Sequence, residues 1–117
     1  MNFSSFLKSQ SYPFDRIPEQ EKEVWDNLKA GDKKALSYIY TKYFNSLYNY
    51  ATRLTNDRSL AEDCIQDLFI EFWNKRESLS DVRNIKYYLY KSLRRKTLHK
   101  LSLTARQTQH DDLLSFE

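Results

Sequence analysis

Glycine, proline and cysteine are scarce in this sequence, with one glycine, two prolines and one cysteine among 117 residues. Few turn-forming residues and few alternating apolar–polar runs favour an all-α fold. A single cysteine excludes an internal disulfide, and the place of Cys64 on an apolar stripe indicates a small buried residue. His99 and His110 have no cysteine or histidine at ligand spacing, so we expect no metal site.

Long apolar runs and catalytic motifs are also missing. The first residues, MNFSSFLKSQSYPF, are too polar for a signal peptide, and no stretch is long enough to span a bilayer, which favours a cytoplasmic protein. One glycine cannot form a glycine-rich phosphate loop, and neither histidine has a plausible nucleophile beside it. Asp63 and Asp67 lie one turn apart on an exposed face, which suits partner salt bridges better than acid–base catalysis. We therefore expect neither an enzyme nor a cofactor.

The residues that are present suit one small domain with an uneven charge. Apolar residues make up 40% of the chain and aromatic residues 15%, enough for one core in a chain of this length. Eight basic residues and no acidic one lie between Arg83 and Arg106. The other 11 basic residues are outnumbered by 16 acidic ones, so the remainder carries a net charge of −5. The basic block favours a phosphate-facing surface, with a merely solvated helix as the alternative.

The first half of the chain predicts two helices. Pro18 suits the first turn of a helix, and Gly31 is placed to end it in a left-handed conformation. Asp32 can cap the second helix, whose apolar stripe recurs at 3.6-residue spacing. The stripe consists of Leu36, Ile39, Tyr40, Tyr43, Phe44, Leu47, Tyr50, Ala51 and Leu54. Its aromatic residues could form a stacking platform, but the spacing favours a packed core.

Residues 59–76, SLAEDCIQDLFIEFWNKR, predict a third helix with two faces. Ser59 and Glu62 form a capping box at its start. The inward face consists of Ala61, Cys64, Ile65, Leu68, Phe69 and Phe72, and the outward face of Asp63, Gln66, Asp67, Ile70 and Asn74. An isoleucine within an acidic face favours a partner helix that brings basic groups and one apolar contact. An ordinary solvated surface is the alternative.

A fourth helix follows the polar break at 77–81, and Asp81 or Asn84 could cap it. Its inward face consists of Ile85, Tyr88, Leu89, Ser92 and Leu93, and its outward face of Tyr87, Tyr90, Lys91 and Arg94, with Leu98 and Leu101 beyond. Aromatic rings can stack on unpaired bases, at about 1–3 kcal/mol per base, while Lys and Arg hold phosphates. The outward face therefore predicts contact with single-stranded nucleic acid.

We divide the chain into three parts. Residues 1–16 mix serine, glutamine and scattered aromatics and are expected to form a flexible arm. Residues 17–103 form the helical domain. Residues 104–117 turn polar and then acidic, and are expected to form a linker.

Several motifs of this chain occur together in a known family. The pattern D-x-x-Q-[DE]-x-F-x-x-x-W stands here as Asp63, Gln66, Asp67, Phe69 and Trp73, and residues 30–36 and YLYKSL add further matches. With these motifs, residues 23–101 resemble region 2, the promoter-melting domain, of bacterial sigma factors of the extracytoplasmic-function group. The resemblance implies a compact all-α bundle of three to four helices and a non-catalytic transcription initiation factor.

The resemblance also implies partners and contact residues. The third helix would dock on the clamp helices of the β′ subunit of core RNA polymerase, through Asp63, Gln66, Asp67, Ile70, Trp73 and Asn74. The loop 77–84 and the fourth helix would hold the single-stranded promoter −10 element, with one base flipped into a pocket near the loop. The DNA contacts would be Arg83, Asn84, Lys86, Tyr87, Tyr90, Lys91, Arg94 and Arg95. An anti-sigma factor is a further expected partner.

The chain departs from this family at two points. Arg95 stands where the family often has asparagine, so the resemblance does not imply a base-reading role at this position. The family's C-terminal helix-turn-helix domain, which reads the −35 element, is absent, so we expect the chain to be a piece of a longer protein. Two alternatives remain open: a helical protein that binds single-stranded nucleic acid, and a bundle that binds a regulator, each without a polymerase partner. Promoter sequence, stimulus and oligomeric state are not specified by these residues.

Overall fold

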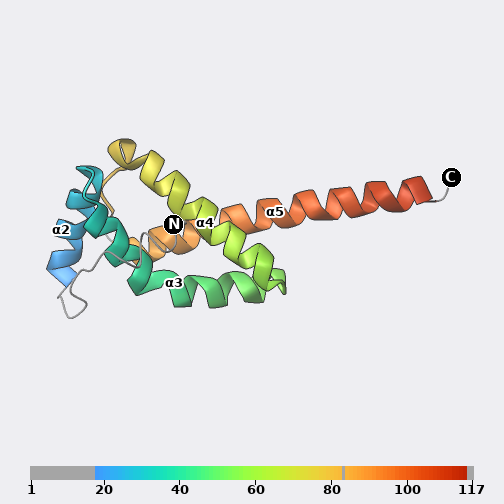
Figure 1. Cartoon of the computed structure of the whole chain (residues 1–117), viewed down its shortest axis with the longest axis horizontal. Coiled ribbons are helices and arrows are strands. Elements are labelled where there is room, and N and C mark those ends of the chain that lie inside the picture. The colour runs from blue at the N-terminus through green and yellow to red at the C-terminus, as the bar shows by residue number, and fades with distance from the viewer. Residues whose placement is uncertain (1–17, 83, 116–117) are drawn as a thin grey trace.

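The computed structural model describes the backbone of residues 18–82 and 84–115, and the side chains of residues 21–82 and 84–107. The arm predicted at 1–16 and the predicted DNA contact Arg83 lie outside these residues. The helices are α2 (Pro18–Lys29), α3 (Lys33–Thr55), α4 (Arg58–Asn74) and α5 (Ile85–Ser115), with a 3₁₀ turn, η1 (Arg76–Ser78), after α4. The expected all-α helical bundle is confirmed (Figure 1).

The core lies where α3, α4 and α5 meet, with α2 packed against the start of α3. The inward faces predicted for the third and fourth helices are confirmed, apart from Tyr88, which is half-buried. Tyr38 and Ser37 are buried as well, although they lie outside the predicted stripe of α3. The spacing missed them because α2 also covers α3 at its start, so these turns are enclosed on more than one side.

Trp25 of α2 ties this helix to the rest of the bundle. Its ring centroid lies 5.4 Å from that of Phe72 in α4 and 5.4 Å from that of Tyr88 in α5. Its indole Nε1 donates a hydrogen bond to the backbone oxygen of Ser80, at 3.0 Å. A buried tryptophan with its polar atom satisfied adds a large apolar contact without leaving an unpaired donor. Helix α2 is thereby held beside the loop that precedes α5.

Short-range signals set the helix ends. Gly31 has a φ of +94° and ends α2 as predicted, and Asp32 caps α3 by accepting from the backbone nitrogen of Lys34 at 2.9 Å. The predicted capping box at Ser59 is wrong. Asp57, in extended backbone, is the N-cap of α4 and accepts from the backbone nitrogen of Leu60 at 3.1 Å, so Ser59 already lies within the helix.

Helix α5 begins at a cap and continues past the predicted domain boundary. Asn84 Oδ1 accepts from the backbone nitrogen of Tyr87 at 3.0 Å, whereas Asp81 forms an ion pair with Lys29 at 3.3 Å. The helix then continues to Ser115, through most of the segment expected to be a linker, and projects beyond the other helices (Figure 1). No glycine or proline occurs between 85 and 115, so nothing in the local sequence ends the helix at 103.

Candidate polymerase and nucleic-acid interfaces

The outward side of α4 presents the predicted acidic face, which we define as Asp63, Gln66, Asp67, Ile70 and Asn74. Four of these side chains are exposed and Gln66 is half-buried. Ile70 keeps 41% of its surface exposed and is the one apolar side chain of this face. The structure therefore brings together every residue of this face.

Trp73, predicted with the acidic face, occupies a different setting. It is half-buried and packs against the core. The guanidinium of Arg76 lies 4.1 Å from its ring centroid, and Arg76 Nη1 donates to the backbone oxygen of Trp73 at 3.0 Å. Trp73 thus forms the edge of the acidic face and is covered by a cation.

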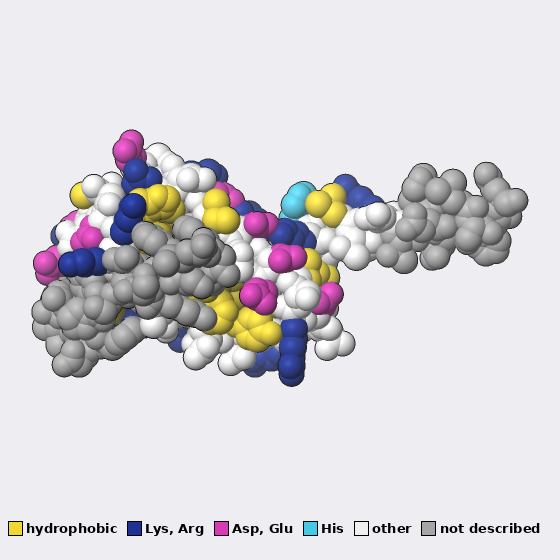
Figure 2. Space-filling view, viewed as in Figure 1, with side chains coloured by type: hydrophobic (Ala, Val, Ile, Leu, Met, Phe, Trp, Pro, Cys, Tyr) yellow, Lys and Arg dark blue, Asp and Glu magenta, His cyan; other side chains and the backbone are white. Residues whose placement is uncertain are grey.

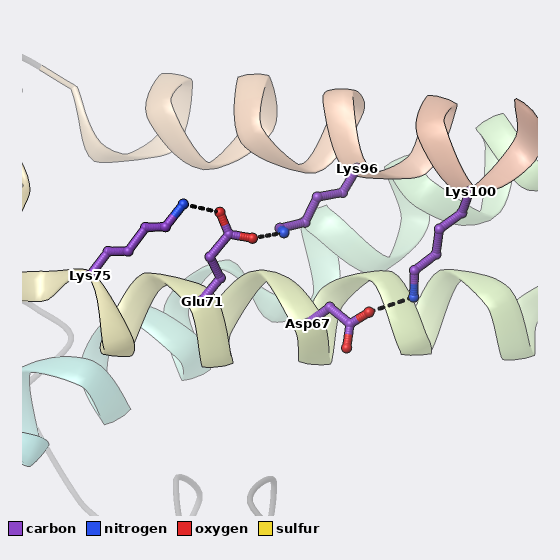
Figure 3. A network of polar contacts seen from close by, with 5 residues as sticks. All are labelled: Asp67, Glu71, Lys75, Lys96 and Lys100. Carbon is purple, nitrogen blue, oxygen red and sulfur yellow. Dashed lines mark hydrogen bonds and ion pairs between the residues drawn. The ribbon is translucent and has the colours of Figure 1, made fainter. Parts of the chain in front are cut away.

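Two carboxylates of α4 form ion pairs with lysines of α5 where the helices cross (Figure 3). Lys100 Nζ lies 2.5 Å from Asp67 Oδ2. Glu71 binds Lys96 through one oxygen and Lys75 through the other, the latter at 2.8 Å. Partial burial lowers the pKa of Lys100, but the hydrogen bond and charge of Asp67 outweigh it, so this pKa lies above its ordinary value of 10.5.

These ion pairs reduce the number of basic side chains in the basic block that are free to face a phosphate. Lys96 and Lys100 belong to the block that predicted a phosphate-facing surface, yet their ammonium groups face α4. Helical spacing within α5 could not reveal this, because the partners lie 25 and 33 residues away in the sequence. In Figure 2, acidic side chains over α4 lie beside Lys and Arg side chains where α5 leaves the bundle.

An open groove runs along the acidic face. It has a volume of about 420 Å³ and is lined by Asp67, Ile70, Glu71, Asn74, Lys75 and Lys96. An exposed isoleucine between charged walls is what an amphipathic helix with one apolar anchor would cover.

The outward face of α5 near its start carries the predicted aromatic and basic residues. Tyr87 is 68% exposed, and Lys91 and Arg94 are exposed as well. Tyr90 is half-buried, with the Lys86 ammonium 5.8 Å from its ring centroid. We call Lys86, Tyr87, Tyr90, Lys91 and Arg94 the aromatic–basic face.

Tyr50 of α3 adjoins this face, a position that the sequence did not predict. Its ring meets that of Tyr90 edge-on, with centroids 5.1 Å apart, and its hydroxyl lies 3.5 Å from Arg94 Nη1. The sequence assigned Tyr50 to the core stripe of α3, and no local signal distinguishes a core tyrosine from one at the rim of a neighbouring helix.

A pocket of about 320 Å³ lies between α2, α3 and the start of α5. It is lined by Glu21, Lys22, Trp25, Tyr43, Val82, Asn84, Ile85 and Lys86. A second, more open hollow of about 260 Å³ is lined by Asn84, Lys86, Tyr87 and Tyr90. The larger pocket lies beside the loop at which a base pocket was expected. Residues of α2 form part of its wall, which the sequence did not predict.

Glu21 organises one wall of the larger pocket. Its Oε1 accepts from the Tyr43 hydroxyl at 2.6 Å and from Lys42 Nζ at 2.5 Å. Burial, and then the hydrogen bond to Glu21, raise the pKa of Tyr43 well above its ordinary value of 10.0. The hydrogen bond from Tyr43 to Glu21 joins α3 to α2.

Arg95 follows Lys91 by one helical turn and therefore borders the aromatic–basic face. It lines a small pocket between α4 and α5, together with Lys75 and Lys96. Among the described residues, no cluster of three metal-ligating side chains occurs. None of the described helices is long and apolar enough to cross a membrane.

A helical bundle with an acidic face on one helix and an aromatic–basic face on the next has the form of a binding module with two partners. The Sigma-70 region 2 family matches residues 39–107, which include α4 and most of α3. The chain therefore belongs to this family, whose members are non-enzymatic transcription factor domains that bind core RNA polymerase and recognise the promoter −10 element. No curated protein and no solved structure matches the chain.

Proposed function

We propose that this chain is region 2 of a sigma factor of the extracytoplasmic-function group. Its acidic face binds the clamp helices of the polymerase β′ subunit, with Asp63, Gln66 and Asp67 as polar contacts and Ile70 as the apolar one. The observation that carries this proposal is Ile70, 41% exposed in the middle of an acidic helix face. An apolar anchor surrounded by charge suits a basic partner helix.

The aromatic–basic face holds the single-stranded −10 element in this proposal. Tyr87 and Tyr90 stack on bases, and Lys86, Lys91 and Arg94 contact phosphates. The pocket beside the loop, with Trp25 and Tyr43 among its walls, receives a base flipped out of the stack. Asn84 lines both hollows and contributes polar groups that a base edge can meet.

The wider setting follows from the same proposal. The functional unit is the helical domain at 17–103, acting in the cytoplasm, where the polymerase is. An anti-sigma factor that covered the acidic face or the aromatic–basic face would keep the domain from its partners.

The docking claim is tested by measuring binding to a helical hairpin peptide that carries the β′ clamp helices. Replacing Asp63 and Asp67 with alanine should weaken binding by about 1–3 kcal/mol, because basic groups of the partner helix lose the negative charges that they face. Asp26→Ala is the matched control, since it removes an exposed carboxylate from α2, away from the acidic face. Equal affinity of the double variant and the intact chain would refute the docking claim.

A second candidate is a module that binds single-stranded nucleic acid without a polymerase partner. The 68% exposure of Tyr87 beside Lys91 and Arg94 favours it, because this face needs no contribution from α4. Binding to single strands irrespective of −10 sequence, with no affinity for the clamp hairpin, would support this candidate over the first.

A further inference from the structure

The groove along the acidic face has ends of opposite charge. Toward the start of α4, Asp67 lines the groove and Asp63 lies one turn before it, and because Lys100 pairs with Asp67 alone this end keeps a net negative charge. At the other end, Lys75, Lys96 and Arg95 line a pocket together with a single carboxylate, that of Glu71. Lys75 stands at the end of α4 itself, and the crossing of α5 over α4 adds Lys96 and Arg95.

A small pocket lies at the positive end of the groove. It measures about 70 Å³ and is lined by Leu68, Glu71, Phe72, Lys75, Tyr88, Ser92, Arg95 and Lys96. One water molecule requires about 10–15 Å³, so the pocket has room for a group of a few heavy atoms, such as a carboxylate. Glu71 already binds both lysines, so its charge offsets one of the three cations and leaves the pocket positive.

We propose that Lys75 and Arg95 bind a carboxylate side chain of the partner helix whose basic residues face Asp63 and Asp67. This inference rests on the proposed function and adds a direction to it, since a helix with cations at one end and an acid at the other fits the groove one way round. Asp67 and Lys75 are eight residues apart, about 12 Å along the axis. The partner's carboxylate therefore lies about two helical turns from the basic residue that faces Asp67.

The α4 wall of this pocket favours a protein carboxylate over a DNA phosphate. Lys96 follows Arg94 by two residues, so it lies about 200° around α5 and faces away from the aromatic–basic face, whereas Arg95 follows Lys91 by one turn and borders that face. Its ammonium is bound to Glu71 of α4. The pocket thus lies at the seam between α4 and α5, next to the groove, with Leu68, Glu71 and Phe72 of α4 as one wall.

The test reverses the charge of each proposed ligand and measures binding to core RNA polymerase and to single-stranded DNA separately. Arg95→Glu and Lys75→Glu should each lower affinity for core RNA polymerase about tenfold or more, measured without DNA, because like charges then meet across the interface. Arg94→Glu is the matched control, since it makes the same change one residue away and should lower only single-strand DNA binding. In each variant, helical content by circular dichroism should equal that of the intact chain.

A compensating charge change in the clamp hairpin identifies the carboxylate that Lys75 and Arg95 bind. Each acidic residue of the clamp hairpin is changed to lysine, and one of these hairpins should restore binding of the Arg95→Glu variant. Unchanged polymerase affinity in both Arg95→Glu and Lys75→Glu would overturn the inference while leaving the docking of Asp67 intact. A loss confined to DNA binding would also overturn it and make the pocket a phosphate site. Failure of the intact chain to bind polymerase would instead refute the proposed function.

Discussion

Tyr43 lines the pocket between α2, α3 and the start of α5, and it also holds α2 against α3. Its hydroxyl donates to Glu21 Oε1 at 2.6 Å, and the same oxygen accepts from Lys42, so one carboxylate joins α2 to two side chains of α3. Partial burial lowers the pKa of Lys42, but Glu21 and Tyr38 outweigh it and raise it above 10.5. Both raised values mean that the folded state holds protons that the unfolded chain loses more readily.

This proton balance predicts lower stability in alkaline solution. A raised pKa stabilises the fold fully below the unfolded value, and this contribution is lost as pH rises through the folded value. For Tyr43 the loss therefore begins near pH 10.0, its ordinary pKa. Tyr43→Phe should show a smaller fall in free energy of unfolding between pH 9 and about pH 11, measured by urea denaturation. A fall as large as that of the intact chain would show that Tyr43 ionises freely in the fold.

At the scale of elements, the start of α4 is decided by its cap. Asp57 accepts from the backbone nitrogen of Leu60, whereas Ser59 lies one residue inside the helix that begins at Arg58. Asp57→Ala should therefore lower the free energy of unfolding by about 0.5–2 kcal/mol. Ser59→Ala should change it by less than about 0.5 kcal/mol, because an exposed serine within a helix adds little. The reverse order in chemical denaturation would restore Ser59 as the cap.

The crossing of α4 and α5 is the other element-scale feature. Asp67 is 52% exposed and its partner Lys100 28% exposed, so water screens their attraction. Such pairs contribute about 0–1 kcal/mol, and apolar packing between the helices carries the stability. The consequence of the pairs is therefore mainly in charge distribution: they place cations beside a face that the sequence shows as acidic.

At the scale of the whole molecule, the basic block divides between two surfaces. Lys86, Lys91 and Arg94 lie on the aromatic–basic face, while Lys96 and Lys100 pair with α4. Under the proposed function, the first group would neutralise phosphates of a strand that follows Tyr87 and Tyr90, and the second group would not. The net charge of the block therefore overstates the number of cations available to DNA.

The salt dependence of DNA binding measures this division. Lys91→Gln and Arg94→Gln should each reduce the slope of log affinity against log salt by about 0.7, the value for one phosphate contact on a single strand. Lys100→Gln removes the same charge from the same helix and should leave the slope unchanged, because its ammonium faces Asp67. An equal reduction in all three variants would show that the strand also reaches the α4 side of α5.

What the sequence by itself determined is local. The periodicity of apolar residues predicted the inward faces of α4 and α5, and Gly31 and Asp32 marked the turn between α2 and α3, because these signals depend on residues within a few positions of one another. The acidic face and the aromatic–basic face were visible for the same reason. The same kind of local signal gave a wrong prediction at the start of α4, where Asp57 and not Ser59 is the N-cap.

Only the tertiary structure decided how these faces are bounded. The pairing of Lys96 and Lys100 with α4, the place of Arg95 in a pocket with Lys75, and the walls from α2 all join residues far apart in the chain. Their positions depend on the angle and register at which helices cross, which packing of the whole core sets. Helical spacing predicts which way a side chain points, but the side chain it meets depends on where the next helix lies.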